Sequence, residues 1–151
     1  VELTVHCAAE LLKRAPEYDY LIAPEAKAIP LLYEMARQSG AEKYFLARKG
    51  AKAYMTGVFE VEVRSITTMH IQKLVIDTAD AEMIKGKKVL IVDDVISTGE
   101  SLHAMEELVK RAGGIIAGKM AVLAEGDAKD RDDIITLAPL PLFNADGSVK
   151  E

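Results

Sequence analysis

An uninterrupted apolar run followed directly by two carboxylates constrains the fold of this chain more than any other feature. Residues 89–92 read Val-Leu-Ile-Val, and Asp93 and Asp94 come next. Consecutive β-branched and leucine side chains are typical of a central parallel strand that is covered on both faces. Because parallel strands need long crossover connections, usually helices, this run predicts an α/β domain.

In the rest of the chain, segments with apolar residues at helical spacing alternate with segments that have the pattern of strands. Apolar residues at helical spacing predict helices, and short apolar or alternating runs predict strands. The expected helices are 1–15, 29–39, 78–85 and 102–112, and the expected strands are 20–23, 44–47, 58–64, 74–76, 89–92, 115–123 and 134–137. Strand 74–76 is expected to pair with 58–64, and Pro139 and Pro141 confine the end of the chain to a sheet edge or tail. The pattern predicts a mostly parallel sheet flanked by helices.

Composition excludes several classes of protein. The chain has 151 residues, of which 50% are hydrophobic, so we expect one domain over 1–151. A net charge of -5 and only a short basic cluster at 85–88 argue against a nucleic-acid partner. The single cysteine, Cys7, favours a reducing compartment, and no apolar run is long enough to cross a membrane. We therefore expect a soluble cytoplasmic protein, and the first residue, Val1, suggests that a leading segment is absent.

The segment after the acidic pair has the composition of an anion site. It contains Ser97, Thr98, Gly99, Glu100 and Ser101. Hydroxyls and backbone N–H groups at the start of a helix bind phosphate, and a glycine lets the backbone approach closely. Carboxylates instead accept hydrogen bonds from sugar hydroxyls or ligate Mg²⁺. The combined segment predicts a site for a phosphorylated sugar.

A simpler interpretation treats the same residues as structural. Ser97 and Glu100 have the spacing of a capping box, and an acidic pair can merely end a strand. Other nucleotide motifs are lacking, because Gly86-Lys87-Lys88 is not a P-loop and no GxGxxG follows a strand. The combination of buried strand, two acids and Ser-Thr-Gly favours the functional interpretation.

That combination closely resembles the signature of type I phosphoribosyltransferases, and the chain is most similar to the adenine and xanthine branch. Glu25-Ala26-Lys27 resembles the Glu-Ala-Arg loop of that branch, which contacts pyrophosphate, and Arg48-Lys49 is similar to its basic pair. The resemblance implies the type I phosphoribosyltransferase fold with a flexible antiparallel loop. It also implies transfer of ribose 5-phosphate from phosphoribosyl pyrophosphate to a purine base, adenine being favoured, with release of pyrophosphate.

The resemblance assigns roles to individual residues. Asp93 and Asp94 would hold the ribose hydroxyls and Mg²⁺, directly or through ribose and water, and residues 97–101 would bind the 5-phosphate. Lys27, Arg48 and Lys49 would neutralise the departing pyrophosphate. With the acidic pair, these three basic residues form the expected catalytic set.

A loop over residues 65–73 would close over the site. We expect it to be poorly ordered without ligand and to bring His70 or Lys73 toward the pyrophosphate on closure. The loop lacks the Glu-Tyr-Gly element of adenine enzymes, and Glu100 stands where they commonly have glycine. Xanthine, hypoxanthine, guanine and orotate therefore remain possible bases.

The resemblance also implies a homodimer and an amino-terminal hood that selects the base, and the hood is expected to be incomplete here. One alternative function is a regulatory protein that binds phosphoribosyl pyrophosphate without turnover. A sensor has no need for Lys27, Arg48, Lys49 and Lys73, so their presence favours the enzyme.

Overall fold

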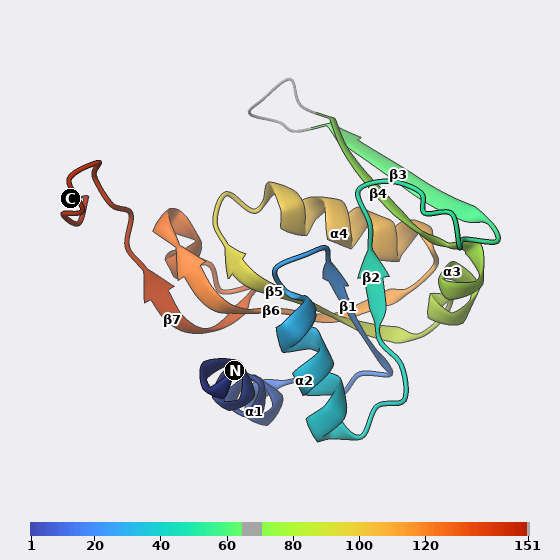
Figure 1. Ribbon diagram of the computed structural model, residues 1–151, viewed down its shortest axis with the longest axis horizontal. Helices are drawn as coiled ribbons and strands as arrows, with labels where there is room; N and C mark the ends of the chain where they lie inside the picture. The colour runs from blue at the N-terminus through green and yellow to red at the C-terminus, as the bar shows by residue number, and fades with distance from the viewer. Residues whose placement is uncertain (65–70, 151) are drawn as a thin grey trace.

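A five-stranded parallel sheet forms the centre of the computed structural model, which describes residues 1–64 and 71–150 (Figure 1). Its strands lie in the order β2-β1-β5-β6-β7, and every neighbouring pair is parallel. The strand bounds are β1 Tyr20–Pro24, β2 Phe45–Ala47, β5 Lys88–Ile96, β6 Ile115–Glu125 and β7 Ile135–Leu140. A separate antiparallel hairpin pairs β3 (Val58–Arg64) with β4 (Ile71–Asp77).

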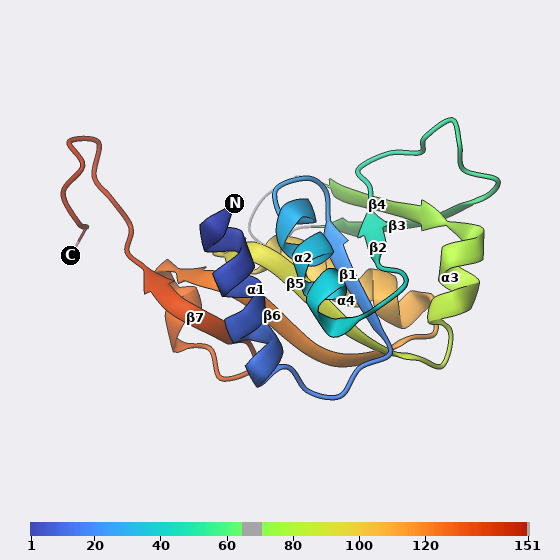
Figure 2. The same ribbon diagram turned by 60° about the horizontal axis from the view of Figure 1, so that its bottom comes forward.

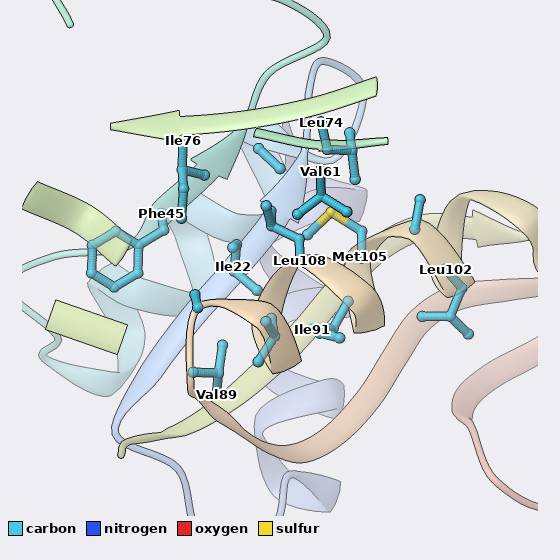
Figure 3. Close-up of a cluster of buried hydrophobic side chains, with 14 of the residues drawn as sticks. Ile22, Phe45, Val61, Leu74, Ile76, Val89, Ile91, Leu102, Met105 and Leu108 are labelled. Carbon is cyan, nitrogen blue, oxygen red and sulfur yellow. The ribbon is translucent and has the colours of Figure 1, made fainter. Parts of the chain in front are cut away.

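Helices cover both faces of this sheet, as the alternation of buried side chains in β5 requires. Leu90 and Val92 pack in one core with α1 (Glu2–Arg14) and α2 (Ile29–Ser39). Val89 and Ile91 belong to the opposite core, which contains side chains of α4 (Glu100–Arg111) and of the hairpin (Figure 3). Figure 2 shows α1 and α2 together on one side of the sheet. The short helix α3 (Thr78–Ile84) connects β4 to β5.

Most of the predicted elements are confirmed. The helix predicted for 29–39 ends at Gly40, whose φ of 72° is the left-handed conformation that glycine adopts readily. The hairpin pairs Val61 with Leu74, as expected for residues 58–64 and 74–76. The fold class predicted from the sequence, a mostly parallel α/β sheet with an antiparallel excursion, is confirmed.

Several details differ from the prediction. The strand predicted for 89–92 continues to Ile96, because its pairing with β6 extends to Ala124 and includes the acidic pair. Ile71, Gln72 and Lys73 belong to β4, although they were predicted as loop, and residues 65–70 of that loop lie outside the described part. The 3₁₀ helix η1 (Gly126–Asp130) was not predicted, since a mostly polar segment of five residues shows no hydrophobic periodicity.

The helices in the described part of the chain are too short or too polar for any of them to cross a membrane. Cys7, the lone cysteine, is buried as a small core residue on α1. Its burial agrees with the sequence interpretation that it packs rather than reacts.

Candidate functional site

A cavity of about 760 Å³ opens at the carboxyl ends of β1 and β5. The strand order reverses between these two strands, because β2 lies beyond β1 and β6 lies beyond β5. In open α/β sheets such a reversal leaves a crevice in which ligands bind. The loop after β1, Lys49 after β2, part of β4, and the end of β5 with the following turn line the cavity. Four segments distant in sequence therefore form one site.

The acidic pair lies in the last part of β5 and faces this cavity. Asp93 and Asp94 are half-buried, and the backbone N–H of Asp94 donates to Asp93 Oδ1 at 2.8 Å. Burial, helped by the neighbouring Asp94 side chain, raises the pKa of Asp93 to about 7, although Lys27 opposes the shift. A cation or a set of hydroxyl donors placed between these carboxylates would relieve this unfavourable accumulation of negative charge.

The turn after β5 does not form the capping box that Ser97 and Glu100 could make. Helix α4 begins at Glu100, and its N-cap, Gly99 with φ 82°, has no side chain that could cap the helix. Thr98 Oγ1 accepts from the backbone N–H of Glu100 at 3.4 Å. Ser97 lies two residues before that N-cap, so the capping-box interpretation is wrong. Ser97, Thr98, Gly99 and Ser101 all line the cavity. The first-turn N–H groups and the helix dipole therefore favour a phosphate here.

The loop after β1 is tied to the end of β2 through Glu25. Its Oε1 accepts from the backbone N–H of Lys49 at 2.7 Å, and its Oε2 pairs with Arg48 Nη1 at 3.1 Å. The Lys49 N–H first, and Arg48 after it, lower the pKa of Glu25 despite partial burial. The peptide bond between Glu25 and Ala26 is cis. Glu25 thus stays ionised and fixes the loop that carries Lys27.

Basic side chains stand on two walls of the cavity. Lys27 and Lys49 line it from the loops after β1 and β2. Lys73 lines it from β4, where its Nζ pairs with Glu60 Oε2 at 2.6 Å, which raises the pKa of Lys73. The cavity therefore has an acidic floor at the end of β5 and cationic groups around it.

The donor set fits a divalent cation that is held mainly through a substrate. Within residues 1–64 and 71–150, no cluster of three or more Asp, Glu, His or Cys side chains could hold a metal alone. Mg²⁺ commonly binds to one or two carboxylates and keeps water and substrate phosphates as its other ligands. Asp93 and Asp94 offer that arrangement at the cavity wall.

The structure brings most of the predicted site residues together. Those lining the cavity are Glu25, Ala26, Lys27, Lys49, Lys73, Asp93, Asp94, Ser97, Thr98, Gly99 and Ser101. Arg48 and Glu100 are not among the lining residues, and Arg48 instead pairs with Glu25. His70 lies outside the described residues.

Sequence reasoning missed two contributions to this region. Leu74 lines the cavity because the hairpin folds back over α4, which no local pattern signals, whereas Ile71 and Gln72 belong to the segment that was expected to close over the site. The guanidinium of Arg131 lies against Gly99, although 32 residues separate them in the chain.

The family model for the phosphoribosyl transferase domain matches residues 5–139. The chain belongs to this family. The phosphoribosyl transferase fold is also found among solved structures: an adenine phosphoribosyltransferase from Thermoanaerobacter pseudethanolicus superposes with a TM-score of 0.72 at 25% identity. That match covers 92% of this chain and 79% of the other.

Two curated members of the phosphoribosyl transferase family differ in the base that they are named for. An adenine phosphoribosyltransferase from Thermotoga sp. (strain RQ2) is 36% identical over 110 residues, 72% of this chain and 60% of that protein. An orotate phosphoribosyltransferase from Caldanaerobacter subterraneus subsp. tengcongensis is 30% identical over 111 residues, 74% of this chain and 47% of that protein. The chain thus spans less than two thirds of the length of these relatives.

Proposed function

We propose that this protein binds phosphoribosyl pyrophosphate and transfers its ribose 5-phosphate to a purine base, adenine being favoured, with release of pyrophosphate. The cavity at the strand-order reversal carries the proposal, because the turn 97–101, two carboxylates and three lysines contribute to its lining. The adenine phosphoribosyltransferases among its relatives support the choice of base. The proposal includes Mg²⁺ as cofactor, a cytoplasmic location and a homodimer.

Each wall of the cavity would bind one part of the donor. The turn 97–101 would bind the 5-phosphate through its backbone N–H groups and hydroxyls. Asp93 and Asp94 would accept hydrogen bonds from the ribose hydroxyls. Lys27 and Lys49 would bind the pyrophosphate, while Arg48 would act indirectly by fixing Glu25.

The chemistry requires stabilisation of a leaving group more than a strong base. As the bond to pyrophosphate breaks, the anomeric carbon gains oxocarbenium character and negative charge develops on the departing oxygen. Lys27 and Lys49 lie where preorganised positive charge would stabilise that oxygen, and bound Mg²⁺ would supply further charge neutralisation. The nitrogen of the base would then bond to the carbon that the site holds in position and lose its proton, which the departing pyrophosphate can accept.

A base panel tests the proposal. The protein would be incubated with phosphoribosyl pyrophosphate, Mg²⁺ and either adenine, xanthine, hypoxanthine, guanine or orotate, and pyrophosphate release would be measured. We expect release with a purine, adenine above the others. Donor binding by calorimetry without release on any base would support the regulatory alternative, and turnover on orotate alone would overturn the choice of purine.

A methyl group at position 99 should weaken donor binding. A β carbon on Gly99 would lie 2.5 Å from Arg131 Nη1, and the φ of 82° is strained for alanine. We expect Gly99→Ala to lower the affinity for phosphoribosyl pyrophosphate about tenfold, or about 1.4 kcal/mol, in calorimetry.

Gly86→Ala provides the matched control. Gly86 has a similar φ of 72°, no atom lies within 4 Å of its added β carbon, and it does not line the cavity. This variant should lose stability without losing donor affinity. Equal donor affinities for Gly99→Ala and the unmodified protein would remove the turn from the proposed site.

A further inference from the structure

Arg131, which follows η1, is held firmly by a carboxylate. Its Nε donates to Asp133 Oδ1 at 2.8 Å and its Nη2 donates to Asp133 Oδ2 at 2.7 Å. This two-point pairing fixes the plane of the guanidinium, because both parallel hydrogen bonds must be kept. Two of the three guanidinium nitrogens are thereby occupied.

Asp133 is itself anchored to the body of the domain. Lys119 on β6 pairs with it and also with Glu106 on α4, at 3.1 Å for the second pair. The Lys119 side chain is only 13% exposed, so these ion pairs are partly shielded from water. Arg131 and Lys119 lower the pKa of Asp133, which therefore stays ionised. The network joins the segment between η1 and β7 to β6 and to α4, whose first turn lines the cavity.

The third nitrogen of Arg131 is directed at the anion-binding turn. A β carbon on Gly99 would lie 2.5 Å from Nη1 and 3.8 Å from Cζ. Among the described residues, Nη1 has no hydrogen-bond acceptor in the structure. Arg131 does not line the cavity, so its guanidinium lies against the turn from outside it. A positive charge thus stands directly behind the glycine whose left-handed conformation shapes the turn.

We propose that Arg131 is a positioning residue for the phosphate-binding turn: it packs against Gly99 and adds positive charge beside the backbone N–H groups that receive the phosphate. This inference rests on the proposed function, because it takes the turn as the 5-phosphate site. The guanidinium fills the space in which Gly99 could otherwise shift, so the turn is prepared before the ligand arrives. Its charge acts on the phosphate end of the cavity and not on the pyrophosphate end, where Lys27 and Lys49 lie.

Separate titrations with ribose 5-phosphate and with Mg²⁺-pyrophosphate test this assignment. Arg131→Met keeps the aliphatic stem and removes the charge, and Lys119 remains to pair with Asp133. We expect it to lower the affinity for ribose 5-phosphate about tenfold, the size expected for one charge acting over several ångströms near a surface. Pyrophosphate affinity should stay within about twofold, because screening weakens the effect with distance.

Two further variants separate charge from structure. Arg131→Lys restores charge without the two-point pairing and should recover part of the lost affinity. Lys129→Met removes one positive charge from η1, where Lys129 is exposed and does not line the cavity, and should leave both affinities unchanged. Thermal unfolding of each variant would be measured alongside.

The outcomes are distinguishable. If the unmodified protein binds neither ribose 5-phosphate nor phosphoribosyl pyrophosphate, the proposed function fails and this inference fails with it. If it binds both, but Arg131→Met binds ribose 5-phosphate as tightly, only the inference is overturned. Parallel losses for ribose 5-phosphate and pyrophosphate in Arg131→Met, with a lowered melting temperature, would also overturn it by showing a general structural role.

Discussion

Replacing both Asp93 and Asp94 by asparagine should reduce Mg²⁺-dependent affinity for phosphoribosyl pyrophosphate at least about 100-fold, or about 2.7 kcal/mol. Both side chains line the cavity at the end of β5. Asparagine keeps their size but removes two negative charges, so hydrogen bonds from ribose hydroxyls weaken and a carboxylate-bound Mg²⁺ loses its ligands. Isothermal titration calorimetry with and without Mg²⁺ would measure the loss.

A double variant with the same change in net charge is the control. Asp127 and Asp132 are exposed, one in η1 and the other just before β7, and neither lines the cavity. Replacing both by asparagine should leave donor affinity unchanged. If the Asp93 and Asp94 double variant bound the donor as tightly as this control, the pair would have no part in the site.

The fold could be predicted from the sequence because its apolar residues recur at clear helical or strand spacings. Val89, Leu90, Ile91 and Val92 alternate between two cores, which requires a strand covered on both faces. Along β3, exposed residues alternate with the buried Val61 and Val63, so this strand of the hairpin could also be predicted from the sequence. The ends of strands were harder to predict. Asp93 and Asp94 have low strand propensity, and β5 continues through them because it pairs with β6.

The part of the site that is contiguous in sequence could also be predicted. The part that depends on tertiary contacts could not. Residues 93–101 are consecutive, so strand, acidic pair and turn could be read together. Arg48 was expected to face the cavity, whereas its pairing with Glu25 depends on the parallel register of β1 and β2. Arg131 reaches Gly99 only because Asp133, Lys119 and the end of β6 hold it there. No spacing along the chain encodes that contact.

Removing the charge of Asp93 alone should stabilise the protein at alkaline pH while it impairs the site. Burial raises the pKa of Asp93 from 3.8 to about 7, so the folded protein binds this proton more readily than the unfolded chain does. Stability therefore falls as pH rises from about 4 to about 7, and the full cost of the buried carboxylate is present above that range. Asparagine carries no charge at any of these values, and its Oδ1 can still accept the N–H of Asp94.

We expect Asp93→Asn to unfold with a free energy on the order of 2 kcal/mol higher than the unmodified protein at pH 8, and with little difference near pH 4. The gain is below the full value of the pKa shift because water still reaches part of this side chain. Denaturant titrations at both pH values, without donor or Mg²⁺, would measure it. Asp132→Asn, which changes an exposed carboxylate, should show no such dependence on pH.

A gain of equal size at pH 4 and pH 8 would contradict the electrostatic cause, since only the ionised form of Asp93 carries the penalty. A stabilised variant that has lost donor binding would show that the site keeps this carboxylate at a cost to folding, because the ligand needs the charge.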